Sequence, residues 1–487
     1  MKSNVTLVTA FYDLEEDRSK DKSNVRYWNL FQHLCETGLP ICLFVSKSFA
    51  VEAELVLKKY KNVKLMSDSL TIQSTLTYQL IYNNPTSVQL PENRTTHHDT
   101  KNFMVMMNSK PEFVAQVATT NPFDTSHFAW IDFGICHVLK DIPNTLNWLK
   151  LICWSKLKPK MLLFPACWTK SFSFARIEHV HSSINWRFCG GFYIGDMASV
   201  LCFSDSCNKS LVTWVNEKHR LTWEVNLWAW MESLPEFDFE PDSYLADHND
   251  TILKVPIEYV SVVGSMTTTP PRIASCRKAI ESLIYQVDHL YLNVCPIYDR
   301  FGKMDTGSFN SLLANEPYQS KLTVQWGPDF GPATKYLGLL KTIDPSTWVF
   351  FADDDQQYHP KLVSNMLPAI KQLGLYQNRY ELLKQTVSGS FGNLTHMSFL
   401  EKMENFTLPE GSLFVDAWLS IYCFIHQVPV FSSKIEAYES IFSKLHKGRE
   451  LSGSNPLSTV QDKEEKLQLL AHYFKVSIDK DGKVNNI

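Results

Sequence analysis

Three consecutive aspartates, Asp353, Asp354 and Asp355, directly follow an apolar run in this chain of 487 residues. Side chains alternate along an extended strand, so Asp353 and Asp355 are expected on one side and Asp354 on the other. Two carboxylates that converge in a partly dry cleft repel each other, and a hard divalent cation relieves that repulsion. Such a cation can bridge the oxygens of a diphosphate and stabilise charge on a leaving group. The alternative interpretation is a solvated acidic turn.

Residues upstream of the aspartates suit a phosphate or a nucleotide. Lys335 lies in "GPATKYLG", where a turn leads into a predicted helix, and free backbone N–H groups at a helix start favour anions. Thr267, Thr268 and Arg272 follow a predicted strand in "SMTTTPPRI", where hydroxyls and a guanidinium could hold a nucleotide. The alternatives are a surface lysine and an ordinary loop stiffened by proline.

The first half of the chain alternates predicted strands and helices. Apolar runs predict strands at 4–13, 39–46 and 62–68, and helical spacing predicts helices at 25–38 and 48–60. This β-α-β-α-β order implies a mostly parallel sheet covered by helices.

The same order begins again near residue 257. Strands are predicted at the start of 257–272 and at 288–295, 322–327 and 347–355, with helices after residue 272 and at 333–343. A polar stretch ending in proline at 250–258 marks the join. The predicted fold class is therefore α/β, with two tandem Rossmann-like domains at 1–254 and 255–487 and a helical tail after about residue 460. In open α/β sheets, ligands bind beyond the carboxyl ends of the strands, where the aspartates should lie.

Composition excludes several classes of protein. The formal charge is -4 and no dense basic run occurs, which argues against nucleic acid as a partner. No run of about 18 apolar residues predicts a membrane span, and the first residues do not resemble a signal peptide. The 11 cysteines are irregularly spaced without C-x-x-C, which is typical of thiols in a reducing compartment. The expected location is the cytoplasm, or the host cytoplasm if the protein is viral.

The order of motifs from residue 258 to 455 resembles the GT-A glycosyltransferases of viral and bacterial glycan-building enzymes. The motifs are "SMTTTPPRI", "LYLNVCPIYDRF", "DFGPATKYLG", "WVFFADDDQQYHP" and "GSLFVDAWLSIY". The resemblance implies that Asp353 and Asp355 bind Mn²⁺ or Mg²⁺ and the nucleotide sugar, and that His446 completes the metal site. It also implies that Asp416 deprotonates the acceptor hydroxyl, a role that needs an ionised carboxylate within hydrogen-bond reach. A carboxylate stabilised by a helix dipole and an exposed histidine are the alternatives for these two residues.

The first half resembles another set, the bacterial HtrL/YibB-like proteins, which are themselves similar to GT-A transferases. The matching pieces are "VTAFYDL", "NSKPEFVAQVATTNPF", "FAWIDFGI" and "RFCGGFYIG". The resemblance implies that Lys110 and Asp132 face the nucleotide diphosphate and that Glu224 lies near the acceptor. Gly134 stands where a second acid would be, so a metal here would need other ligands, with His248 a candidate by its late position. This unit could instead have lost activity.

These observations predict a bifunctional glycosyltransferase that passes sugars from nucleotide-sugar donors to an oligosaccharide or glycan acceptor. The alternative is one active domain beside a non-catalytic, carbohydrate-binding scaffold. A protein kinase is a poor match, because its glycine-rich loop, catalytic lysine and H-R-D motif are missing. The histidines lack the spacing of a zinc enzyme. A glycoside hydrolase would use two carboxylates without needing Lys335.

Overall fold

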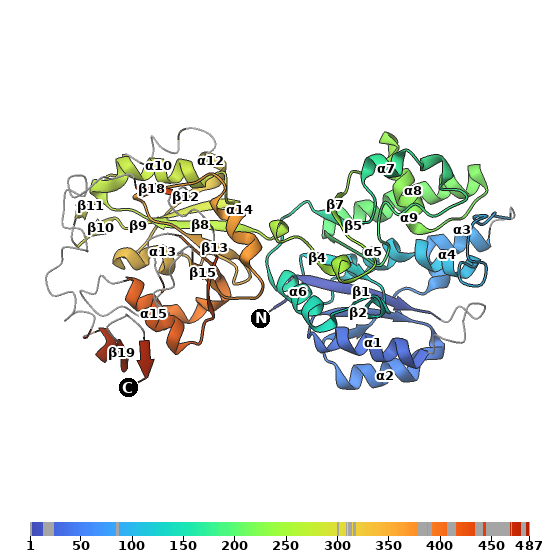
Figure 1. Ribbon diagram of the computed structural model, residues 1–487, viewed down its shortest axis with the longest axis horizontal. Helices are drawn as coiled ribbons and strands as arrows, with labels where there is room; N and C mark the ends of the chain where they lie inside the picture. Colours follow the sequence, from blue (N-terminus) through green and yellow to red (C-terminus); the bar gives the residue numbers. More distant parts are fainter. Residues whose placement is uncertain are drawn as a thin grey trace. The chain divides into compact units, whose positions relative to one another are not determined.

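The computed structural model describes residues 2–12, 24–83, 87–299, 301–307, 318–377, 392–406, 415–433, 442–444, 470–478 and 484–486, and the single residues 309, 314, 387 and 468. The chain divides into two compact units between Pro256 and Ile257, two residues after the join expected from the sequence. Each unit contains a seven-stranded sheet among the described residues (Figure 1).

The sheet of the N-terminal unit has the strand order β3-β2-β1-β4-β6-β5-β7. The strands are β1 Val5–Phe11, β2 Ile41–Val45, β3 Val63–Leu65, β4 His127–Ile131, β5 Leu162–Ala166, β6 Phe192–Asp196 and β7 Asp242–Leu245. Strands β3, β2, β1 and β4 are parallel, β6 runs antiparallel to both β4 and β5, and β5 is parallel to β7. The central strands β2 and β4 are buried at every residue, as expected for strands covered on both faces.

Helices cover this sheet on both faces. They are α1 Asn24–Glu36, α2 Ala50–Lys59, α3 Leu76–Tyr82, α4 Lys101–Asn108, α5 Lys110–Thr120, α6 Ile142–Trp154, α7 Lys170–Phe174, α8 Met197–Lys218 and α9 Glu224–Glu232. A single core joins Val8, Phe44 and Trp130 of the sheet to Phe113 of α5 and Trp214 of α8. Figure 1 shows α1 and α2 on the other side of β1 and β2 from α5. Helix α5 packs on β4, so it holds its first residue, Lys110, against the central strand.

The sheet of the C-terminal unit has the order β12-β9-β8-β13-β16-β15-β17. Its strands are β8 Val262–Thr267, β9 His289–Val294, β12 Leu322–Trp326, β13 Trp348–Phe351, β15 Leu375–Gln377, β16 Asn393–His396 and β17 Val430–Ser432. When the seven strands of each sheet are numbered in chain order, the two sheets have the same strand order. In both sheets the sixth strand is antiparallel to its neighbours. The sequence prediction that the architecture restarts is confirmed.

The C-terminal unit has five described α-helices, of which α13 and α15 contribute to a second core. They are α10 Ile273–Leu283, α12 Tyr318–Lys321, α13 Thr334–Leu337, α14 Leu362–Met366 and α15 Val415–Ile425. The core joins Val349 and Phe351 of β13 to Tyr336 of α13 and Trp418 of α15. Figure 1 shows α10 and α15 on opposite sides of β8 and β13. Three two-stranded ribbons complete the described unit: β10 Ile297–Tyr298 with β11 Gly302–Lys303, β14 Gln356–Tyr358 with β18 Phe442–Lys444, and β19 Val476–Ile478 with β20 Val484–Asn486.

The predicted α/β class with two tandem, mostly parallel sheets is confirmed. The predicted helix at 333–343 is wrong in length, because α13 ends at Leu337. The next residue, Gly338, packs so closely on the Asn293 side chain that a Cβ there would overlap it. The predicted tail helix after residue 460 falls largely outside the described residues. Among the described helices, none combines the length and the apolar character needed to cross a membrane.

Candidate active sites

Both candidate sites lie where the fourth strand of the sheet ends. Asp132 directly follows β4, and Asp353 follows β13 after one alanine. Each strand is preceded in the chain by a helix that carries a lysine, Lys110 in α5 and Lys335 in α13. The two units therefore place the same pair of residue types at the same point of the same topology.

In the N-terminal unit, the Lys110 ammonium contacts three acceptors. Its Nζ lies 3.0 Å from Asp132 Oδ1 and 2.8 Å from Glu224 Oε1. It also donates a 2.8 Å hydrogen bond to the carbonyl oxygen of Gly190. The Lys110 side chain is only 1% exposed, that of Glu224 6%, and that of Asp132 38%. The ammonium thus joins a buried carboxylate to one that reaches solvent.

The charged state of Lys110 depends on these carboxylates. Burial disfavours the ammonium, but Asp132 and Glu224 outweigh that effect and raise the pKa of Lys110. Lys110 therefore stays protonated across the neutral range. Because the Glu224 carboxylate is buried and paired with an ammonium, its geometry is that of a counterion as much as that of a base.

Asp132 is fixed from two sides. The indole Nε1 of Trp130 donates to its Oδ1 over 2.7 Å, and the backbone N–H of Asp132 donates to the Gly191 carbonyl over 2.9 Å. A Cβ at Gly190 would overlap the Glu224 carboxylate, so only glycine lets this segment approach the lysine.

Packing against Tyr27 explains why residue 134 is a glycine. A Cβ at this position would overlap the ring of Tyr27, so no second acid can stand two residues after Asp132 without moving that ring. The absence of a D-x-D pair from the N-terminal unit is thus built into its packing.

In the C-terminal unit, Lys335 pairs with Asp353. Its Nζ lies 2.5 Å from Asp353 Oδ1, with the lysine side chain 3% exposed and the aspartate side chain 26% exposed. The backbone N–H of Asp353 donates to the hydroxyl of Tyr358 over 2.8 Å. Burial disfavours the ammonium, but Asp353 above all, with a weaker contribution from Asp416, raises the pKa of Lys335. The carboxylate that faces solvent is again held from behind by a buried cation.

The next two aspartates face different surroundings. Asp354 is buried and accepts hydrogen bonds from Thr268 Oγ1 at 2.7 Å and from Arg272 Nη1 at 2.9 Å. Burial raises the pKa of Asp354, and Arg272 and Thr268 oppose that rise. The Asp355 side chain is 28% exposed and lies 3.9 Å from Arg272. Asp353 and Asp355 are thus partly accessible and Asp354 is internal, but the predicted strand at 347–355 is too long, because β13 ends at Phe351 and Asp354 and Asp355 lie in a turn.

The other predicted site residues of this unit are Thr267, Asp416 and His446, and the structure describes the first two. Thr267 donates from its hydroxyl to the Asn293 carbonyl oxygen over 2.7 Å, so it helps to join β8 to β9. Asp416 lies in the first turn of α15 and is close enough to Lys335 to affect its pKa. His446 lies outside the described residues.

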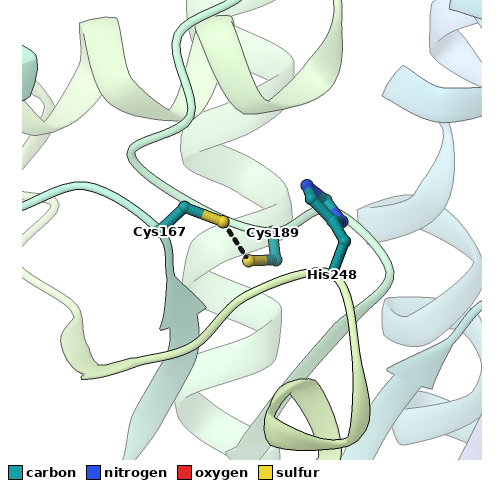
Figure 2. A group of neighbouring side chains, drawn as sticks. All are labelled: Cys167, Cys189 and His248. Carbon is teal, nitrogen blue, oxygen red and sulfur yellow. Dashed lines mark hydrogen bonds between the residues drawn. The ribbon is translucent and has the colours of Figure 1, made fainter. Parts of the chain in front are cut away.

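Sequence reasoning missed a cluster of three metal-ligand types in the N-terminal unit. The sulfur atoms of Cys167 and Cys189 are 2.9 Å apart, and His248 lies beside them (Figure 2). The hydrogen bond with Cys189 lowers the pKa of Cys167, against the effect of burial and with a further contribution from His248. Only the late position of His248 hinted at this cluster, because the two cysteines do not have zinc-finger spacing.

Comparisons with known proteins agree with the division of the chain. Residues 3–219 match the family model HtrL_YibB, described as a bacterial protein of unknown function. The match lies within the N-terminal unit and covers less than half of the chain. No curated protein shows significant similarity to this sequence.

Several solved structures resemble part of the chain. They include 4-diphosphocytidyl-2C-methyl-D-erythritol synthase from Anaerococcus prevotii (13% identity, 44% of this chain and 97% of that one, TM-score 0.27). Glucosyl-3-phosphoglycerate synthase from Mycobacterium tuberculosis, solved with Mn²⁺, UDP-glucose and phosphoglyceric acid, is similar at 14% identity (40% and 74%, TM-score 0.28). A Drosophila β-1,4-galactosyltransferase 7 mutant with manganese, UDP-galactose and xylobiose is similar at 12% identity (43% and 80%, TM-score 0.29). Similarities at these scores carry no functional argument.

Replacing Lys110 tests the buried ion pair. Lys110→Met leaves the Glu224 carboxylate buried without its cation, and such a break typically costs about 3–5 kcal/mol. Glu224→Gln in the same chain removes the stranded charge, so the double variant should regain part of the loss, with a coupling of about 0.5–3 kcal/mol. Urea unfolding of the wild type, both single variants and the double variant measures this. Strictly additive losses would contradict the pairing.

The three aspartates of the C-terminal unit should differ in their effect on stability. Asp354→Ala leaves Arg272 and the Thr268 hydroxyl without their acceptor, so we expect a loss of about 1–3 kcal/mol. Asp355→Ala changes a partly exposed side chain and should stay within about 0.5 kcal/mol of the wild type. Thermal unfolding compares the two variants. Equal losses would mean that Asp354 and Asp355 do not have the distinct roles assigned here.

Proposed function

We propose that the chain is a bifunctional glycosyltransferase, in which each unit transfers a sugar from a nucleotide donor to a growing glycan. The observation that carries the proposal is the asymmetry within the aspartate run. Asp353 and Asp355 present partly exposed carboxylates beside Lys335 and Arg272, whereas Asp354 is buried in hydrogen bonds to the protein. A solvated acidic turn, the alternative at the sequence level, would not need a buried lysine behind it.

In the C-terminal unit, Asp353 and Asp355 would hold Mn²⁺ or Mg²⁺. The fit rests on the donor set, because two accessible carboxylates are the oxygen ligands that hard divalent cations prefer. When bound, the cation would neutralise charge on the departing diphosphate. Arg272, whose side chain is 31% exposed, offers a second positive group to the same anion. We assign Thr267 and Thr268 to shaping the nucleotide pocket through their contacts with Asn293 and Asp354, and not to direct capture.

For the acceptor, Asp416 is the proposed base. It lies in the first turn of α15 and contributes to the raised pKa of Lys335, which places its charge near the Lys335–Asp353 pair. A base must lie within hydrogen-bond reach of the acceptor hydroxyl while it is ionised. His446 remains the proposed third metal ligand, on the strength of the sequence resemblance alone.

In the N-terminal unit, Lys110 and Asp132 would face the donor diphosphate and Glu224 would support Lys110. Only Asp132 of the three has a substantially exposed side chain, and an acid in place of Gly134 would have to displace the Tyr27 ring. These two facts favour a mechanism without a D-x-D metal in this unit. They also support the second candidate, a carbohydrate-binding scaffold beside one active domain.

We further propose a reducing, cytoplasmic setting, which agrees with eleven free cysteines.

Removing one metal ligand should abolish donor binding by the C-terminal unit. Asp355→Asn should lose the part of the thermal stabilisation by a panel of UDP-sugars that depends on Mn²⁺ in the full chain. That stabilisation is about 2.7 kcal/mol when the donor is at 100 times its dissociation constant. Loss of several kcal/mol of transition-state stabilisation also predicts transfer slowed more than about 100-fold. A chelator should reproduce both effects in the wild type.

The matched control is Glu404→Gln, which removes a carboxylate of the same unit that pairs with Lys341 outside the proposed site. This variant should keep both donor stabilisation and transfer. Mn²⁺-dependent donor binding that survives Asp355→Asn would refute the metal assignment.

Asp132→Asn separates the two candidate roles of the N-terminal unit. Lys110 keeps Glu224 and the Gly190 carbonyl in this variant, so the fold should be retained. If the unit is catalytic, the first sugar transfer should fall by at least about tenfold, the rate equivalent of 1.4 kcal/mol, while the second transfer to a pre-formed acceptor is unchanged. Mass spectrometry of the products measures both steps. An unchanged two-sugar product would instead leave the scaffold interpretation standing.

A further inference from the structure

The cluster of Cys167, Cys189 and His248 lies outside the Lys110–Asp132–Glu224 site. One ligand atom from each residue lies within 4.8 Å of the other two. Figure 2 shows Cys167 at the end of a strand, with Cys189 and His248 on neighbouring loops; the two sulfur atoms face each other, and His248 lies on the Cys189 side of the pair. Two thiols and one imidazole are the ligand types that Zn²⁺ prefers in proteins.

The backbone positions all three residues. Cys167 directly follows β5, and the N–H of Cys189 donates to the Pro165 carbonyl of that strand over 2.8 Å. The N–H of Ala246 donates to the Ala166 carbonyl over 2.9 Å, so the segment before His248 is also fixed to β5. The His248 ring packs edge-on against Trp186 at a centroid distance of 4.5 Å. Backbone hydrogen bonds at the carboxyl end of β5 thus hold all three residues near one another.

The sulfur separation of 2.9 Å is longer than a disulfide bond and shorter than the spacing around a metal. A disulfide has a length of about 2.05 Å and makes no use of a histidine. Tetrahedral Zn²⁺, with Zn–S bonds of about 2.3 Å and Zn–N bonds of about 2.0–2.1 Å, separates its ligand atoms by about 3.5–3.8 Å. A small rotation of the Cys167 side chain, which is only half-buried, would open the pair to that distance.

We propose that Cys167, Cys189 and His248 form a Zn²⁺ site with three protein ligands and a fourth position open to solvent. Cys189 is buried, Cys167 is intermediate and His248 is exposed, so the ion would be reached from the histidine side. Three protein ligands with one open position are the arrangement of catalytic zinc sites, whereas structural sites close all four positions. This proposal stands independently of the glycosyltransferase proposal.

The zinc site would adjoin the Lys110–Asp132–Glu224 site through one short segment. Cys189 is followed by Gly190, whose carbonyl accepts from Lys110, and by Gly191, whose carbonyl accepts from the Asp132 N–H. Zinc would therefore give this unit a cation that its single exposed aspartate cannot hold by itself.

Zinc binding by the full chain tests the proposal. Protein that has been reduced and stripped of metal should take up one Zn²⁺ that excess Mg²⁺ does not displace, as measured by elemental analysis after gel filtration. Co²⁺ in its place should show the absorption of thiolate-to-cobalt charge transfer. Loss of even an outer partner weakens metal sites by about 10–100-fold, so loss of the ligand His248 in His248→Ala should weaken binding at least about tenfold.

The controls distinguish the cluster from other thiols and from misfolding. His248 is exposed, so His248→Ala should unfold at the wild-type temperature in the absence of metal. Cys167→Ser should lose the charge-transfer band, and Cys202→Ser, which changes an exposed cysteine on α8, should keep both the band and the affinity. Reduced protein that binds no Zn²⁺ overturns the proposal. So does binding that persists in both cluster variants, or a Cys167–Cys189 disulfide that forms in air even with Zn²⁺ present.

Discussion

A buried ammonium held against a carboxylate at the end of a central strand is the interaction on which both units depend. Removing a lysine from water is costly unless an opposite charge lies close, and Lys110 and Lys335 are each almost fully buried. In both units the partner carboxylate keeps one side toward solvent. The lysine therefore fixes the position of an acid that can still meet a ligand, and the sheet fixes the position of the lysine.

The two units use this interaction with different neighbours. Behind Asp132, a second carboxylate, Glu224, faces the same ammonium, and the packing of Tyr27 on Gly134 leaves no space for another acid. In the C-terminal unit, Asp354 turns inward to Thr268 and Arg272, which leaves Asp353 and Asp355 available together. The same strand order thus carries two partly exposed aspartates in one unit and a single partly exposed aspartate, Asp132, in the other.

Much of the fold could be predicted from the sequence, because buried parallel strands and amphipathic helices carry strong local patterns. The strand ends near Asp132 and Asp353 follow from those patterns, whereas the inward turn of Asp354 does not, because β13 ends at Phe351 and Asp354 and Asp355 lie in a turn. Other features depend on contacts between distant residues. The run "FYIGD" predicts a strand but carries no signal for the direction in which the strand runs. The antiparallel orientation of β6 therefore cannot be predicted from it. The burial of Lys110 depends on Glu224, 114 residues later, and no local signal connects the two.

The cysteine cluster shows why the sequence spacing typical of zinc ligands did not reveal the proposed zinc site. Zinc-binding spacings are recognisable when one short turn supplies two ligands, because the geometry is then local. Here one ligand follows β5, the next precedes the glycines that contact Lys110, and the third comes after β7, so the sheet brings together what the sequence separates. The same sheet edge positions Gly190 and Gly191 against Lys110 and Asp132. A shift of the 189–191 segment would therefore alter the thiol pair and the lysine's acceptor together, which makes the two sites mechanically dependent on each other.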